Sequence, residues 1–227
     1  MILAIALALA AAQAAPCPEV VTAEAFVCRA IGASADQKPQ AAAEAFEQAA
    51  QSLESADPET SRLWAAAGNM WIAADRPGKA AHALDRALEG SGLRAEQRGL
   101  ALLDRARAAE AQNDLKTARA KANEAAGTIS EDPFLWYFSA ALAIREGDRA
   151  AAKSSIAKAL ALAPADPVIL FEAGHVAQFT GDLVGARHYW TRVVQLDPKG
   201  QAGQSAREAL KLLPAQLTVQ SEPAPAK

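Results

Sequence analysis

The sequence is poor in the patterns from which function is most often inferred. Positive and negative charges nearly balance, with 23 Lys and Arg against 26 Asp and Glu, and neither sign gathers into a block or stripe. This distribution argues against nucleic acid and against an anionic membrane surface as partners. No stretch alternates apolar and polar residues with β-branched enrichment, so almost no sheet is expected.

Motifs for chemistry are missing as well. The sequence has no glycine-rich phosphate loop and no nucleophile elbow. Its three histidines, His82, His175 and His188, lack the spacing of metal ligands on one helix. The acidic residues are spaced as solvated helix charges and not as a confined carboxylate pair. We therefore expect no catalysis, no cofactor and no metal.

Only two cysteines occur, and both follow a leader-like segment. Residues 2–12 form an apolar run, and Ala12-Gln13-Ala14 then offers a small-x-small cleavage site. This pattern predicts a secretory signal peptide over residues 1–14, although no Lys or Arg precedes the run. The run is short for a membrane span. We expect an exported, periplasmic protein that is not inserted in the membrane once processed; an uncleaved N-terminal anchor is the alternative.

Export bears directly on the two thiols. An oxidising compartment would allow Cys17 and Cys28 to form a disulfide that ties residues 15–21 to the first helix. Two free thiols, and lipid attachment at Cys17, are the alternatives that the sequence leaves open.

The chain does contain a helix-pair pattern that recurs at a nearly fixed spacing. A bulky residue is followed four positions later by a small one at Phe26/Ala30, Trp64/Gly68, Leu102/Ala106, Trp136/Ala140 and Leu170/Gly174. Twelve residues after each small residue stands an alanine, at Ala42, Ala80, Ala118, Ala152 and Ala186. The last two steps are 34 residues and the first two are 38, so we expect four extra residues in each of the earlier junctions. Such a period is typical of a solenoid.

Turn residues mark where the expected helices end and begin. Asn113, Gly147 and Gly181 suit the left-handed conformation that ends a first helix, and an aspartate follows each of them as an N-cap. Asp-Pro pairs at 57–58, 132–133 and 166–167 mark the starts of new units.

The pattern resembles the tetratricopeptide repeat (TPR) family over roughly residues 22–200. It is clearest in residues 167–200, which contain Leu170, Gly174, Gly181-Asp182, Ala186, Trp190 and Leu196-Asp197-Pro198. The resemblance implies an all-α, right-handed α-solenoid of about five helix-turn-helix repeats with a C-terminal capping helix. Within residues 22–213, we expect units near 23–56, 61–94, 99–132, 133–166 and 167–200, and a cap at 201–213. Residues 214–227 are expected to form a disordered Pro/Ala-rich tail.

The family's architecture implies that the first helices line a concave face. One stripe of these helices is free of repeat packing and is aromatic and apolar with a few polar groups. Its candidate partner-binding residues are Phe134, Tyr137, Ala141, Arg145, Phe171, His175, Gln178, Asn69 and Arg107. This composition predicts a surface for a protein or peptide with apolar anchors, and an acidic ligand group could reach Arg145 or Arg107. Alternatively, the stripe fills gaps between adjacent first helices.

The sequence therefore predicts a non-catalytic interaction scaffold of the cell envelope. The family's carboxylate-clamping pattern is met only by Asn69 and Arg107, because its lysine is absent, so a C-terminal carboxylate ligand is disfavoured. A self-associating structural spacer is one alternative. An accessory subunit of an envelope enzyme, or an envelope enzyme with His175 in the groove, is another. A catalytic His175 would need Glu110 as its facing carboxylate. The sequence does not fix the oligomeric state.

Overall fold

The computed structural model describes residues 17–214, so the predicted signal peptide and nearly all of the predicted tail lie outside the described residues. This part of the chain contains eleven helices and no strand. None of these helices has both the length and the apolar character needed to cross a bilayer. The helices are α1 (Ala23–Ala35), α2 (Pro39–Gln51), α3 (Pro58–Ala73), α4 (Pro77–Glu89), α5 (Ala95–Ala111), α6 (Leu115–Ala125), α7 (Pro133–Glu146), α8 (Arg149–Leu162), α9 (Pro167–Phe179), α10 (Leu183–Leu196) and α11 (Gln201–Leu212).

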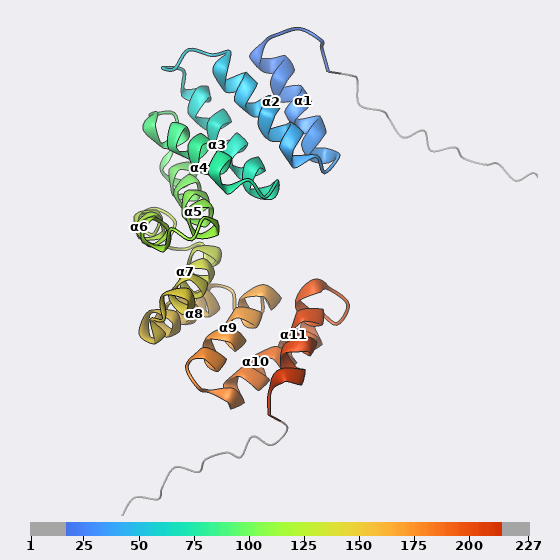
Figure 1. Ribbon diagram of the computed structural model, residues 1–227, viewed down its shortest axis with the longest axis vertical. Helices are drawn as coiled ribbons and strands as arrows, with labels where there is room; N and C mark the ends of the chain where they lie inside the picture. Colours follow the sequence, from blue (N-terminus) through green and yellow to red (C-terminus); the bar gives the residue numbers. More distant parts are fainter. Residues whose placement is uncertain (1–16, 215–227) are drawn as a thin grey trace, which may run out of the picture.

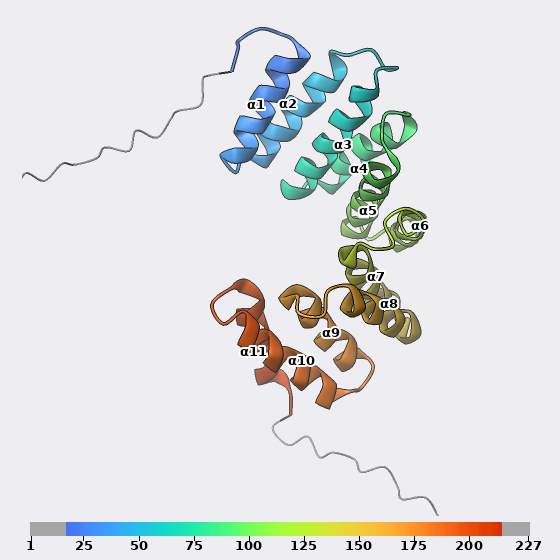
Figure 2. The same ribbon diagram turned by 180° about the vertical axis from the view of Figure 1, so that it is seen from behind.

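The helices stack as five antiparallel pairs that bend into an open arc, and α11 covers the last pair (Figures 1 and 2). The α1–α2 pair lies at one end of the arc and α9–α11 at the other. Of the middle and last pairs, α5 and α9 lie on the inner side of the bend, whereas α6 and α10 lie on the outer side (Figure 1). The predicted all-α solenoid with a C-terminal capping helix is confirmed.

Most of the extra residues of the two longer steps lie inside helices, so the prediction that the junctions hold all four of them was wrong. Helices α3 and α5 contain 16 and 17 residues, against 14 in α7 and 13 in α9. The additional turn precedes Trp64 and Leu102, so the second and third units begin at Pro58 and Ala95. Pro58 stands at the first position of α3, where a missing backbone N–H costs little.

Each turn between paired helices contains one residue with positive φ. Asn113, Gly147 and Gly181 have φ values of 61°, 76° and 89°, as the sequence predicts, and Gln37 and Asp75 fill the same place in the first two units at 58° and 55°. The predicted aspartate caps of α6, α8 and α10 are also confirmed, since each carboxylate accepts a hydrogen bond from a backbone N–H three residues later. These caps fix where the second helix of the third, fourth and fifth units begins.

Small residues allow the paired helices to approach closely. A Cβ atom on Gly174 would lie 2.1 Å from Nε1 of Trp190, which is only 1% exposed. In the second unit, a Cβ on Gly68 would lie 2.4 Å from Cγ of Leu84. The small residues thus serve the packing of paired helices, which leaves the inner surfaces of the first helices free for another use.

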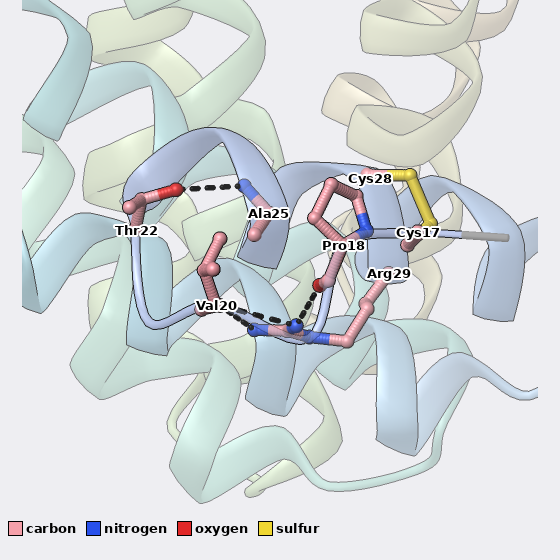
Figure 3. Close-up of a disulfide and its surroundings, with 7 residues drawn as sticks. All are labelled: Cys17, Pro18, Val20, Thr22, Ala25, Cys28 and Arg29. Carbon is pink, nitrogen blue, oxygen red and sulfur yellow. Dashed lines mark hydrogen bonds between the residues drawn. A yellow bond between two sulfur atoms is a disulfide. The ribbon is translucent and has the colours of Figure 1, made fainter.

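The N-terminal segment is tied to α1 by two kinds of bond. Cys17 and Cys28 form a disulfide with an S–S distance of 2.03 Å (Figure 3). The guanidinium of Arg29 donates hydrogen bonds to the carbonyl oxygens of Pro18, at 2.8 Å, and Val20, at 3.4 Å. The segment before α1 therefore lies against that helix.

Candidate partner-binding groove

The inner surfaces of the first helices are hollowed at three successive places. One hollow of about 560 Å³ lies at α1 and α3 (the α1–α3 hollow), and one of about 410 Å³ spans α3, α5 and α7 (the central hollow). A third, of about 450 Å³, lies between α7 and α9 (the α7–α9 hollow). Because Ala141 lines both the central and the α7–α9 hollow, these two adjoin. We call the three hollows together the groove.

The central hollow combines predicted stripe residues with apolar neighbours. Tyr137, Ala141 and Arg107 line it, together with Ile72 and Phe138. Tyr137 is half-buried, and burial raises the pKa of its hydroxyl above the ordinary value of 10.0, with a smaller contribution from the negative charge of Glu172. The hydroxyl therefore stays protonated at neutral pH and can donate a hydrogen bond to a ligand.

The α7–α9 hollow brings together four of the predicted residues, Ala141, Arg145, His175 and Gln178. The remaining wall is formed by Ile144, Phe179 and the buried Glu172. Each of the two helices thus contributes both apolar and polar groups to the hollow. Glu172 is the acidic member that the repeat pattern did not predict.

Asn69 belongs to the α1–α3 hollow and is joined to the next first helix. Its Nδ2 donates to Oδ2 of Asp104 at 2.9 Å, and Nη1 of Arg107 donates to Oδ1 of the same carboxylate at 2.8 Å. Asp104 therefore holds two of the predicted residues in place and neutralises the charge of Arg107.

Arg145 is also satisfied within the protein. Its guanidinium pairs with the carboxylate of Glu110 and donates to Oδ1 of Asn113 at 2.8 Å. An acidic ligand group at Arg107 or Arg145 would therefore have to compete with the carboxylates of Asp104 and Glu110. Because Glu110 pairs with Arg145, it is not the partner of His175; the Nδ1 atom of His175 lies 3.4 Å from Oε2 of Glu172 instead.

The two phenylalanines among the candidates differ in their surroundings. Phe134 is 48% exposed and meets Tyr137 edge to face, with the ring centroids 6.3 Å apart. With Leu100 and Val168, each 34 residues away, it forms a row of exposed apolar side chains along α5, α7 and α9, which we call the rim row. Phe171 is not among the residues that line the three hollows. Its ring centroid lies 4.4 Å from that of His175, so it packs against one of the residues that line the α7–α9 hollow.

The described residues show no metal-binding cluster. Within residues 17–214, no three His, Cys, Asp or Glu side chains gather so that they could hold a metal ion. The polar groups of the groove are instead joined in pairs, such as Asp104 with Arg107 and Glu110 with Arg145. Such pairs fix the shape of the groove.

Sequence comparison gives no relative, but structural comparison does. No protein-family model matches the chain, and no curated protein matches its sequence. PilF of Pseudomonas aeruginosa is similar in structure, with a TM-score of 0.66 and 17% identity over 83% of this chain and 82% of PilF. PilW, a widely conserved type IV pilus biogenesis factor, has a TM-score of 0.67 and 17% identity over 82% of each chain.

YrrB, a TPR protein with an unusual peptide-binding site, is similar as well. Its TM-score is 0.59, with 16% identity over 82% of this chain and 92% of YrrB. At these identities the likeness concerns the fold. The chain therefore has the fold of TPR solenoids, as the repeat spacing predicts.

Proposed function

We propose that this protein is a non-catalytic scaffold that binds a peptide or a partner helix along the groove. The observation that carries the proposal is the succession of three hollows along the five first helices, the last two of which share Ala141. A concave surface on a rigid stack of helices suits an extended or helical segment, because the binding residues need no rearrangement.

The ligand would be held mainly by apolar anchors. The rim row supplies Leu100, Phe134 and Val168, which are 41–48% exposed. Hollows of 410–560 Å³ are large enough for several side chains, and Tyr137 offers an aromatic face with a protonated hydroxyl. Aromatic side chains in such places commonly carry most of the binding energy. YrrB, of the same fold, is described by its peptide-binding site, which accords with this mode.

A blocking substitution tests the groove directly. Ala141→Trp would fill the place where the central and α7–α9 hollows meet, whereas Ala157→Trp adds the same side chain on an exposed position of α8. We expect both variants to keep the helicity and melting temperature of the unmodified protein. Partners enriched from the native envelope fraction, and peptides selected from a random library, should be lost only with Ala141→Trp. Equal retention by both variants would place the binding surface elsewhere.

We also propose that the chain is exported to the periplasm as a soluble protein. The proposal rests on the leader-like residues 2–14 and on the Cys17–Cys28 disulfide, a bond that persists in oxidising compartments. Mass spectrometry of the native N-terminus should find a chain that begins at or near Ala15. An intact Met1 in a membrane fraction would contradict processing, and a diacylglycerol adduct on Cys17 would show lipidation instead.

Self-association is the competing function. Exposed apolar side chains stand at both ends of the solenoid, with Val21 at 81% and Leu212 at 82% exposure, and could join copies end to end. Sedimentation over a range of concentrations distinguishes the two functions. A monomer at all concentrations supports the scaffold, whereas growing assemblies that survive Ala141→Trp support the spacer.

A further inference from the structure

Two first helices carry a carboxylate at the same place in the repeat. Asp104 and Glu172 each stand two residues after the bulky residue of their unit, Leu102 or Leu170. Both side chains are largely buried, at 17% exposure for Asp104 and 9% for Glu172. The neighbours of equivalent carboxylates in a stacked array also occupy equivalent positions. The hydrogen-bond donors around Asp104 can therefore be compared with the residues at the same positions around Glu172.

Asp104 is fully compensated by two donors that stand five residues after a bulky residue. The amide of Asn69 comes from the preceding first helix, at 2.9 Å, and the guanidinium of Arg107 comes from the same helix, at 2.8 Å. The carboxylate thus has one neutral and one cationic donor. This arrangement is the usual way in which a protein tolerates a buried charge.

Glu172 lacks both of these donors. The residue equivalent to Asn69 is Ala141, which has no donor, and the residue equivalent to Arg107 is His175, whose Nδ1 lies 3.4 Å away. Across the described residues, His175 is the one side chain that forms an ion pair with Glu172. Glu172 is therefore nine-tenths buried with the imidazole of His175 as its single close partner, and it can accept a further donor.

The missing donor is replaced by space that opens to solvent. Ala141 and Glu172 line the same α7–α9 hollow of about 450 Å³, with Ile144 and Phe179 as apolar walls. Arg145 lines this hollow as well, but its guanidinium is already paired with Glu110. The hollow therefore combines apolar walls with a carboxylate whose only close partner is the imidazole of His175.

We propose that the α7–α9 hollow binds a basic side chain, Arg or Lys, of the peptide partner. The aliphatic stem would lie against Ile144 and Phe179, and the charged head would donate to Glu172 from the place that the Asn69 amide occupies beside Asp104. The proposal rests on the groove being the binding surface and adds the chemistry of one anchor. It differs from the expectation of an acidic ligand group, because both arginines already have a carboxylate partner, whereas Glu172 has only the imidazole of His175.

A double-mutant cycle with peptides tests this assignment. Peptides are selected from a random library on the full chain, and only those displaced by Ala141→Trp are retained. We expect them to share one Arg or Lys next to apolar residues. Replacing that Arg by citrulline, which keeps the shape and removes the charge, should weaken binding to the unmodified protein about 10- to 100-fold. For peptides with Lys, norleucine serves the same purpose.

The protein side of the cycle uses Glu172→Gln, with Glu89→Gln on α4 as the control for net charge. Glu172→Gln should weaken the Arg peptide by a similar factor, and citrulline should then cause little further loss, because the two changes remove the same contact. Glu89→Gln should bind as the unmodified protein does. If Glu172→Gln fails to fold, the citrulline comparison on the unmodified protein decides.

Two outcomes overturn the proposal, and they differ in what they leave standing. Groove-dependent peptides that bind equally with Arg, citrulline or norleucine would refute the basic anchor while the scaffold function remains. A selection that yields no peptide sensitive to Ala141→Trp would refute both the anchor and the groove.

Discussion

Gly174→Ala tests the packing between the two helices of the fifth unit. Gly174 lies on α9, where α9 crosses α10, and an added Cβ would stand 2.1 Å from Nε1 and 2.4 Å from Cδ1 of Trp190. Trp190 is 1% exposed, and its Nε1 donates to the backbone oxygen of Phe171 at 3.0 Å. The indole therefore has to move, and moving it strains or breaks this buried hydrogen bond.

Three contributions set the size of the effect. Overpacking a dense core costs about 1–3 kcal/mol. Losing the indole hydrogen bond to Phe171 costs about 1 kcal/mol more. Replacing glycine by alanine within a helix returns about 1 kcal/mol, because the unfolded chain loses conformational freedom. We expect the free energy of unfolding to fall by roughly 1–3 kcal/mol in Gly174→Ala.

Urea denaturation followed by circular dichroism measures this change, and Gly32→Ala is its matched control. Gly32 lies within α1, and nothing would come within 4 Å of an added Cβ there, so this variant should gain about 1 kcal/mol. Combining Gly174→Ala with Trp190→Phe should cost less than the sum of the single changes, since the smaller ring leaves room. Equal stability of the two alanine variants would refute the packing argument.

Three further predictions concern the termini, the middle and the groove. Replacing Cys17 and Cys28 by serine should destabilise the first helix pair by about 2–3 kcal/mol through loop-closure entropy, seen as faster hydrogen exchange in α1 but not in α10. Glu146→Gln should cost about 1 kcal/mol in denaturation at low salt and less at high salt, because Arg119 of α6 donates two hydrogen bonds to this partly exposed carboxylate of α7. Tyr137 has a raised pKa, so its stabilising effect should be complete below pH 10.0 and lost as the pH rises through the folded pKa; Tyr137→Phe should reduce this alkaline loss in denaturation curves.

Local signals in the sequence predicted the turns where the residue itself prefers the observed conformation. Asn113, Gly147 and Gly181 were recognisable because asparagine and glycine tolerate positive φ. Asp75 shares this tolerance with asparagine, whereas Gln37 adopts the same conformation without it. There the geometry of the helix pair imposes the backbone conformation, and only the repeat alignment could have shown it.

The extra turns of α3 and α5 illustrate a different limit. The 38-residue steps revealed that residues were inserted, but periodicity alone does not distinguish a longer helix from a longer loop. Local signals did exist. Pro58 follows the N-cap Asp57, and the Gln97 side chain accepts from the backbone N–H of Arg94 in a capping arrangement. Helix starts read from these caps would have placed the insertion correctly.

The sequence predicts which residues line the groove, but it does not predict which of their charges are paired. Helical spacing showed which residues share the inner face of each first helix. Compensation, however, depends on pairs that join successive first helices, such as Asn69 with Asp104 and Glu110 with Arg145. These partners are 35 residues apart, and their distances follow from how the units stack. Spacing within one helix therefore could not reveal that the arginines are paired.

The position five residues after each bulky residue can vary the specificity of the groove without changing the fold. Packing uses the bulky residue and the small one four later, whereas the fifth position faces the groove and holds Ile31, Asn69, Arg107, Ala141 and His175 in turn. An apolar chain, an amide, a guanidinium, a methyl and an imidazole can occupy it because the stack does not depend on their chemistry. A solved structure of 17% identity can therefore share the frame of this solenoid and bind a different ligand. Exchanging Ala141 for Asn should place a donor beside Glu172 as Asn69 does beside Asp104, and it should remove the need for a basic ligand group without disturbing the fold.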